Sequence, residues 1–325
     1  MATDSSNDSI MTDSDKLRIV ADFILHAPPG QFREVFNGWN YFYFDCSVIL
    51  FCTYSTDVRH LLSNDSLLKD KASNIFAQYR KDQLTPAALS DNEFTLITEF
   101  NELGSNRFYN PKTKKSFKYD FLTEETSEIQ SWEPDAANEP WRSALEEIWS
   151  VYCADHYYNG ISSVFATNQH DHFVLSACIE AHQFQPNNYW LVVAFAILLL
   201  MILKSRNGLW RSIWTITFNP NLGKAEIFGK IKAQVHYYEN GNVQLVSFKE
   251  IKDSTSFSSE KQLAENFKSI VEESENEYQV AIAKNYQNMS DTTFKALRRA
   301  LPVTRSKIDW HKIMGYRIGS EIKQT

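Results

Sequence analysis

Strand-like segments in the middle of the chain restrict its fold more than any other feature. They are residues 162–166, 173–183, 212–218, 226–238 and 242–248. Turn signals separate them, and most carry the β-branched and aromatic residues that strands favour. We therefore expect a central antiparallel sheet.

The best hairpin in the chain lies between the last two of these segments. Asn240-Gly241 suits a two-residue type I′ turn. In that register Val235, Tyr237, Val246 and Phe248 share one face of the sheet, and Tyr238, Val243 and Leu245 share the other. Both faces are apolar, so we expect the sheet to be covered on both sides, at least in part.

A long helical pattern, residues 258–288, follows the strands. Its apolar residues keep helical spacing and are Leu263, Phe267, Ile270, Val271, Tyr278 and Ile282. Its outer face is predicted to be acidic, with Glu272, Glu273, Glu275 and Glu277. A helix of this length can lie across more strands than one small domain provides, which suggests a sheet shared with a partner. An ordinary core helix is the alternative.

The N-terminal part has a different pattern. Residues 1–13 are predicted to be disordered, and residues 14–84 to form short antiparallel helices. The first is capped by Ser14 or Asp15, the second begins at residues 32–37, and the third covers residues 67–79. Short strands and loops are expected over residues 85–121, and an acidic, irregular surface loop over residues 123–138.

A further helix is expected to begin near Pro140. Its buried stripe is predicted to be Leu145, Ile148, Trp149 and Tyr152. Residues 85–289 are thus predicted to hold the sheet and the long helix, and residues 290–325 a separate basic extension. The expected fold class is α+β, with N-terminal antiparallel helices, a central antiparallel sheet, a long C-terminal helix over the sheet and a short amphipathic basic tail.

Catalytic and metal-binding patterns are weak in this sequence. It has no Gly-rich phosphate loop, and Asp155, His156 and the serines form no recognisable triad. His170 and His172 fit a surface pair in a strand turn better than a metal site. Cys178 is interpreted as a small core residue, and the four cysteines as reduced thiols. We expect no cofactor and no enzymatic activity. Residues 1–14 lack the basic and apolar regions of a secretory signal.

Charge sets the C-terminal segment apart. Residues 290–325 contain eight Lys or Arg and three Asp or Glu, a net charge of +5, whereas the whole chain carries −7 and residues 1–289 therefore −12. A basic amphipathic end on an acidic body indicates an acidic partner, although a solvated helix face fits the charge pattern as well.

Within this segment the spacing predicts a helix that begins at Ser290 or Asp291 and ends near Pro302. Lys295 and Arg299 lie four residues apart on one face, with Arg298 at its border. Arg305 precedes a second amphipathic pattern. Its apolar residues are Trp310, Ile313, Met314 and Ile318.

Residues 294–310, FKALRRALPVTRSKIDW, resemble the C-terminal signature of the F-actin capping protein alpha-subunit family. Residues 178–190, CIEAHQFQPNNYW, continued after a break by residues 207–214, NGLWRSIW, are similar to its central signature. The resemblance implies an obligate heterodimer with a beta subunit through a joint antiparallel sheet with long helices over it. It also implies calcium-independent binding to the barbed end of the actin filament, which blocks subunit exchange.

The resemblance also implies roles for individual residues. Lys295, Arg299 and Arg305 match the family's basic residues that contact actin, and Arg298 lies beside them. Trp310, Ile313, Met314 and Ile318 would form a short helix that docks in an actin groove. The implied location is the cytoplasm and the actin cytoskeleton, with acidic phosphoinositides as possible regulators and no nucleic acid.

Two apolar segments, residues 38–56 and 191–206, interrupt the family pattern. Each splits a motif that is continuous without it, and their residue types use T-rich codons. We therefore interpret both as translated intron or gene-model error. Residues 190–203 form an uncharged run of 14, shorter than the about 20 that a bilayer needs. A membrane protein, and a basic-tailed adaptor that binds anionic lipid, nucleic acid or another acidic partner, are the alternatives.

Overall fold

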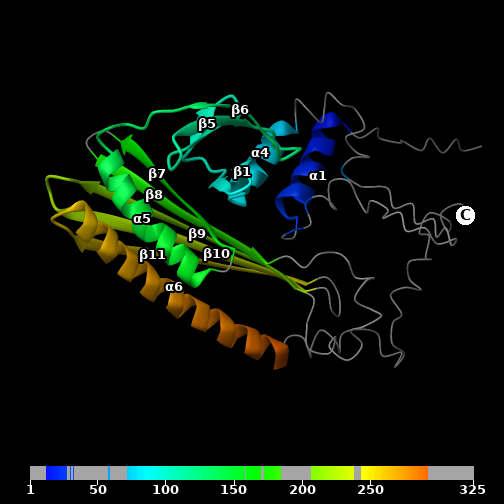
Figure 1. The fold of residues 1–325 in the computed structure, drawn as a ribbon. Helices are drawn as coiled ribbons and strands as arrows, with labels where there is room; N and C mark the ends of the chain where they lie inside the picture. The colour runs from blue at the N-terminus through cyan, green and yellow to red at the C-terminus, as the bar shows by residue number, and fades with distance from the viewer. Residues whose placement is uncertain are drawn as a thin grey trace, which may run out of the picture. The chain divides into compact units, whose positions relative to one another are not determined.

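The computed structural model describes residues 12–27, 30, 32, 58, 72–157, 159–169, 172–183, 206–237 and 243–291. The chain divides into two compact units, Met1–Tyr278 and Gln279–Thr325, and the fold below is that of the first unit. The mixture of helices and antiparallel sheets confirms the predicted fold class (Figure 1).

Five long antiparallel strands form the main sheet, in the order β11-β10-β9-β8-β7. They are β7 (Ile161–Gln169), β8 (His172–Gln183), β9 (Arg206–Asn219), β10 (Lys224–Tyr237) and β11 (Val243–Ser256). All five strands were predicted, and each is as long as predicted or longer. Arg206, predicted as the last residue of the second insertion, is the first residue of β9 and pairs with Tyr237.

The predicted register of the last hairpin is wrong by one residue. Val235 pairs with Leu245 and Tyr237 with Val243, so five residues, 238–242, separate the two strands. Because side chains alternate between the two faces, this shift moves Val246 and Phe248 to the face opposite Val235. The predicted two-residue turn lies outside the described residues.

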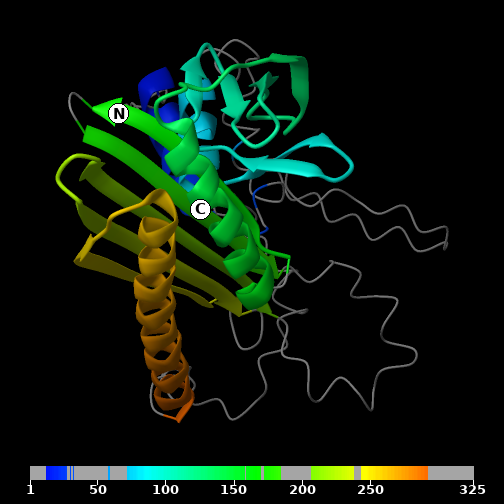
Figure 2. The ribbon, with the colours of Figure 1, turned by 60° about the vertical axis from the view of Figure 1, so that its left-hand side comes forward.

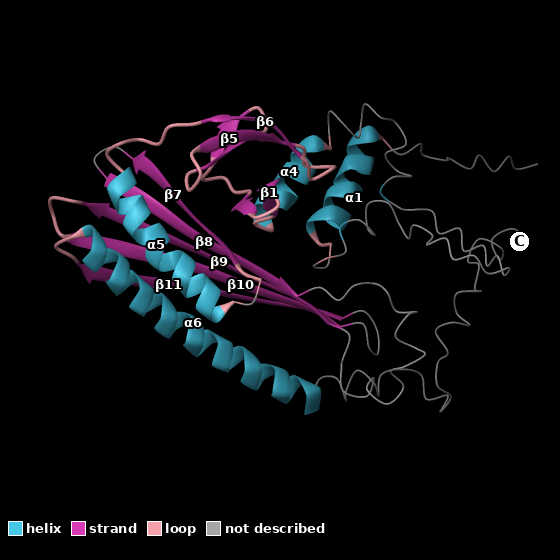
Figure 3. Ribbon diagram, in the orientation of Figure 1, coloured by secondary structure: helices cyan, strands magenta, loops and turns pink. Residues whose placement is uncertain are grey.

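Two helices cover one face of the main sheet, α5 (Glu139–His156) and the part of α6 (Glu260–Asp291) that lies in the first unit, residues 260–278, as Figures 2 and 3 show. Pro140 lies in the first turn of α5, as predicted, because that turn does not need its N–H. Trp149 of α5, Trp214 of β9 and Phe267 of α6 are buried together. Most of the predicted stripes are buried: Leu145, Trp149 and Tyr152 of α5, and Leu263, Phe267, Val271 and Tyr278 of α6, whereas Ile148 and Ile270 are half-buried.

The N-terminal elements are α1 (Asp13–Leu25) and α4 (Ser73–Asp82). Thr12, and not Ser14 or Asp15, caps α1: its side chain accepts a hydrogen bond from Asp15 N at 3.2 Å. Val20 and Ile24 of α1 are buried. Phe32 is buried, but the rest of the predicted second helix lies outside the described residues.

Two small antiparallel sheets follow α4 along the chain. One contains β1 (Pro86–Ser90) and β2 (Glu93–Leu96), and the other β3 (Glu102–Gly104), β4 (Arg107–Asn110), β5 (Lys115–Tyr119) and β6 (Thr126–Ser131). The short strands over residues 85–121 were predicted, whereas β6 lies in the segment predicted to be irregular. Its residues are mostly exposed, so the sequence of β6 carries little of the alternation that marks a strand.

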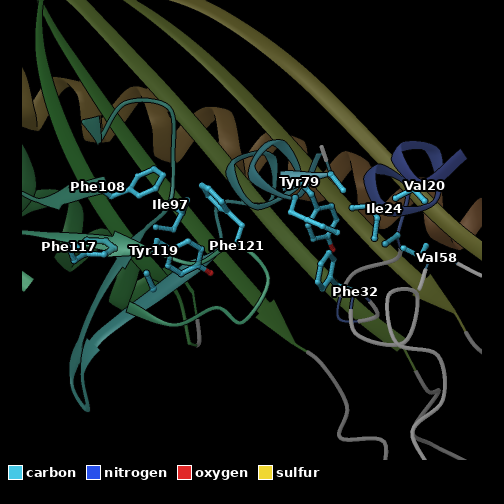
Figure 4. Packing of buried hydrophobic residues seen from close by; sticks show 14 residues of the cluster. Val20, Ile24, Phe32, Val58, Tyr79, Ile97, Phe108, Phe117, Tyr119 and Phe121 are labelled. Atoms are coloured by element: carbon cyan, nitrogen blue, oxygen red, sulfur yellow. The ribbon is translucent and has the colours of Figure 1, made fainter. Parts of the chain in front are cut away.

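A continuous core joins the N-terminal helices to the small sheets, as Figure 4 shows. Tyr79 of α4 stacks on Phe32 with a ring-centroid distance of 5.0 Å, and Phe108 of β4 contacts Tyr119 and Phe121 edge to face. A second cluster joins Leu84, Leu96 and Tyr109 to Phe165 and Cys178 on the second face of the main sheet. Cys178 is thus a core residue, as predicted.

Among the described helices, none is both long and apolar enough to cross a membrane. The apolar run of residues 191–203 lies outside the described residues.

Candidate functional site

The residues predicted to contact actin follow residue 291 and lie outside the described residues. They are Lys295, Arg298, Arg299, Arg305, Trp310, Ile313, Met314 and Ile318. Two features of the described residues bear on function. One is the outer strand β11, and the other is a buried carboxyl group between α6 and the sheet.

The strand β11 forms one edge of the main sheet and is 14 residues long. Within the described part of the chain it pairs with β10 alone. An edge of this length offers a row of backbone N–H and C=O groups to another strand. Lys249, Glu250, Lys252 and Asp253 protect its second half, whereas its first half is mainly apolar.

The face of β11 that points away from the helices exposes two large apolar side chains. Val246 is 55% exposed and Phe248 57% exposed, opposite Gln234 and Lys232 of β10. Farther along this face, a hollow of about 620 Å³ is lined by Thr215 and Thr217 of β9, Phe228 of β10 and Lys252 of β11. Cover on this face is therefore partial, and β10 and β11 offer an uncovered apolar patch next to an open edge.

Helix α6 packs along the other face of the same strands. The hydroxyl groups of Ser247 and Tyr278 are 2.6 Å apart, and Lys249 Nζ lies 2.9 Å from Glu277 Oε2. The interaction with Glu277 is on the surface, and it contributes well under about 1 kcal/mol to stability.

Glu275 of α6 is the most unusual residue of this layer because it is fully buried (0% exposed). Its carboxylate accepts hydrogen bonds from the hydroxyl of Tyr152 at 2.8 Å and from that of Tyr157. Its other oxygen accepts from Trp214 Nε1 at 3.0 Å. The prediction that Glu275 belongs to the exposed acidic face is wrong.

The pKa of Glu275 is raised above its ordinary 4.5 because burial disfavours the charged form, and hydrogen bonds from Tyr157, Tyr152 and Trp214 oppose this rise. Burial, together with the Glu275 charge, also raises the pKa of both tyrosines. Both hydroxyl groups therefore keep their protons and act as donors at neutral pH.

A second buried polar group ties the opposite face of the sheet to the N-terminal part. Arg211 of β9 donates to the carbonyl oxygen of Asp82, at the end of α4, and to Gln234 of β10. Burial lowers the pKa of Arg211 to about 10, which still leaves it charged at neutral pH.

His182 of β8 is also paired. Its Nδ1 atom lies 2.8 Å from Glu180 Oε1, and this hydrogen bond raises the pKa of His182.

A third buried group lies at the start of α5. Arg142 binds Glu139 through two nitrogen atoms, and Glu146 accepts from the backbone N–H of Val164 at 3.0 Å. The pKa of Glu146 is raised by burial. These contacts fix α5 on β7 and are structural.

Several residues considered for chemistry have other roles. Cys153 and Cys178 are free and buried, and burial raises the pKa of Cys153 to about 11. His172 is exposed, whereas His170 lies outside the described residues. Among the described residues no group of three His, Cys, Asp or Glu could hold a metal ion.

Comparisons with known proteins agree on one family. The family model described as F-actin capping protein alpha subunit matches residues 51–321. The chain is 44% identical to F-actin-capping protein subunit alpha of Caenorhabditis elegans, over 97% of this chain and 100% of that protein. It is 33% identical to the subunit alpha of Dictyostelium discoideum, over 95% and 98% of the two chains.

The fold also has a solved counterpart. The homodimeric actin capping protein alpha subunit from Plasmodium berghei matches with a TM-score of 0.68 over 90% of this chain and 99% of that chain. Because the two sequences are only 16% identical, this structural match supports the fold alone.

Proposed function

This chain belongs to the F-actin capping protein alpha-subunit family, and we propose that it binds the barbed end of the actin filament and blocks the addition and loss of subunits there. The observation that carries this proposal is the 44% identity to a capping protein alpha subunit over that protein's whole length. The comparisons do not support the alternative of a basic-tailed adaptor. Capping is a binding function and involves no catalytic step, and we propose that it needs no calcium in this chain.

Residues 290–325 are the proposed actin-binding extension. Their net charge of +5 suits the acidic surface of an actin filament and would steer association electrostatically. Lys295, Arg299 and Arg305 would form the charged contacts, with Arg298 beside them. The apolar side chains of Trp310, Ile313, Met314 and Ile318 would occupy an actin groove as one face of a short helix.

Charge reversal tests this assignment. We expect Lys295→Glu/Arg299→Glu/Arg305→Glu to weaken capping roughly 100-fold, since three lost charge contacts at about 1 kcal/mol each amount to that factor. The measurement is elongation of pyrene-labelled actin from filament seeds, with the chain paired to a beta subunit. Unfolding by urea should be unchanged.

The matched control reverses three exposed cations of the body, Lys112, Lys114 and Lys261, to Glu. It changes the net charge by the same amount and should retain capping to within a few-fold. Wild-type capping by the extension variant, or equal loss in both variants, contradicts the proposed site.

The proposed partner is a capping protein beta subunit. The open edge of β11 and the exposed Val246 and Phe248 support it, because a strand added at β11 would extend the main sheet and cover apolar surface. Gel filtration after expression with and without a beta subunit tests the pairing. A heterodimer supports the proposal, whereas a homodimer that excludes the beta subunit contradicts it.

Two further features of the family are proposed for this chain. It would act in the cytoplasm on the actin cytoskeleton, and acidic phosphoinositides would regulate it through the same basic extension. Capping assays with vesicles containing phosphatidylinositol bisphosphate, compared with phosphatidylserine vesicles of equal charge, test the regulation. Equal inhibition by both would indicate general electrostatic attraction only.

A further inference from the structure

The stripe of α6 that faces the sheet contains one acid where an apolar residue would fit. Its buried residues are Leu263, Ala264, Phe267, Val271, Glu275 and Tyr278. Glu275 follows Val271 by four residues and continues the apolar face by position, not by chemistry. A leucine at this position would complete the stripe, so helix packing by itself does not explain the carboxyl group.

The carboxylate of Glu275 joins three elements of the first unit. Tyr152 lies in the last turn of α5, Tyr157 directly follows that helix, and Trp214 lies in the centre of β9. Both hydroxyl groups donate to Oε2, and the indole N–H of Trp214 donates to Oε1. Hydrogen bonds are directional. Three donors from two other elements therefore restrict both the rotation of α6 and its displacement along the sheet.

The charge of Glu275 has no ion-pair partner in the described part of the chain. Nearby ionisable groups on the two helices include Cys153 and His156 of α5 and Glu272 of α6, and His156 pairs with Glu272 at 3.6 Å. An apolar residue at position 275 would leave the hydroxyl groups of Tyr152 and Tyr157 and the indole N–H of Trp214 buried without this acceptor. What an apolar residue cannot provide is a single fixed position of the helix, since apolar contacts are non-directional.

The position of α6 matters for the extension that follows it. The helix continues from Glu275 to Asp291, and Lys295 is four residues farther on. We propose that Glu275 is a positioning residue for filament-end binding: its hydrogen bonds to Tyr152, Tyr157 and Trp214 hold α6, the helix that leads along the chain into the proposed actin-binding extension, in one rotation on the sheet. This inference rests on the proposed capping function.

The decisive variant is Glu275→Leu, paired with a beta subunit. It removes the acceptor and restores an apolar stripe. A merely structural role predicts normal capping under all conditions in which the paired variant is folded. A positioning role predicts that the dissociation constant for filament ends increases at least 10-fold under conditions in which urea unfolding shows the paired variant to be folded, although its urea midpoint falls because three buried donors lose their acceptor. Glu273→Leu, an exposed position on the same helix, is the control and should cap like the wild type.

A second variant removes donors without changing the helix. Tyr152→Phe/Tyr157→Phe keeps both rings, and amide hydrogen exchange over residues 268–278 should become at least 10-fold faster while β8 and β9 exchange as before. The same variant should also cap filament ends more weakly than the wild type. If Glu275→Leu does not pair with a beta subunit, the capping assay with the tyrosine variant tests the positioning role instead.

Wild-type capping by a folded, paired Glu275→Leu variant overturns the inference, as does unchanged capping by the tyrosine variant. The extension variant with Lys295, Arg299 and Arg305 reversed separates the two proposals in the same assay. If that variant caps like the wild type, the proposed actin site fails. If it caps weakly while Glu275→Leu caps normally, only the positioning role fails.

Discussion

The indole ring of Trp214 lies over Gly229, its cross-strand partner on β10. A Cβ atom at position 229 would lie 2.4 Å from Cζ3 of Trp214, far inside van der Waals contact. The absence of a side chain at Gly229 therefore makes room for the ring, whose N–H then reaches Glu275. One glycine and one buried acid together determine how the sheet meets α6.

This close approach predicts the effect of a single methyl group. Gly229→Ala should lower the free energy of unfolding by about 1–3 kcal/mol, because Trp214 or the strand must shift. Gly208→Ala is the matched control in the adjacent strand, since no atom lies within 4 Å of its Cβ position, and it should change stability by less than about 1 kcal/mol. Urea unfolding measures both. Equal losses of unfolding free energy in the two variants would show that the close approach of Trp214 does not restrict the side chain at position 229.

The raised pKa of Glu275 predicts a pH dependence of stability. Its folded-state pKa lies above the ordinary 4.5, so its contribution is greatest at low pH and is lost as pH rises through the folded pKa. The unfolding free energy of the wild type minus that of Glu275→Gln should therefore fall as pH increases above 4.5 and then level off. Urea titrations across this range test it, and a constant difference would contradict it.

At the scale of elements, β11 combines two roles. It supports α6 on one face through Ser247 and Lys249, and it leaves its edge and its second face open near Val246 and Phe248. The observed register of β10 with β11, which differs by one residue from the predicted register, decides which side chains of β11 are exposed. The surface offered to a partner is therefore a product of the β10–β11 pairing.

This surface predicts how the proposed pairing with a beta subunit can be weakened. Val246→Lys/Phe248→Lys should weaken pairing roughly 10- to 100-fold, because an added strand would lose two apolar cross-strand neighbours and gain two charges. Gel filtration over a dilution series measures it. The control, Phe94→Lys/Val151→Lys, changes two exposed apolar residues elsewhere and should pair normally. Equal behaviour of the two variants would exclude this face from the interface.

At the scale of the whole molecule, residues 38–56 and 191–206 are the two apolar segments that we interpret as insertions into the family pattern. Adjacent antiparallel strands can be joined by a few residues. The strands β8 and β9 are such neighbours, with Gln183 opposite Gly208, yet 22 residues, 184–205, lie between them. The topology does not require a connection of this length, which supports the hypothesis of translated intron or gene-model error.

Deletion of residues 38–56 and 191–206 tests this hypothesis in the protein. The shortened chain joins Asn37 to Asp57 and Trp190 to Asn207. We expect a higher soluble yield with a beta subunit and full capping activity, because exposed apolar runs promote aggregation. Transcript reads provide the independent check. The hypothesis is contradicted if all transcript reads across these two segments have the long form, or if the shortened chain no longer pairs with a beta subunit.

The sequence by itself determined the order and type of most elements. Apolar residues at helical spacing located most of the buried faces of α5 and α6, and strand-like segments with turn signals between them located β7–β11. The resemblance of residues 294–310 to the family signature is the basis of the proposed actin-binding site, which no packing argument could supply. These features are local, since periodicity and motifs depend only on neighbours along the chain.

The tertiary structure alone decided the register of β10 with β11, the open face with Val246 and Phe248, and the burial of Glu275. By sequence, Glu275 is one of several acids on a helix and differs in nothing from Glu273 or Glu277. It is buried because Tyr152, Tyr157 and Trp214, which lie 123, 118 and 61 residues away along the chain, present donors to it. Hydrogen bonds over such separations exist only once the sheet and both helices are assembled, so no local pattern can encode them.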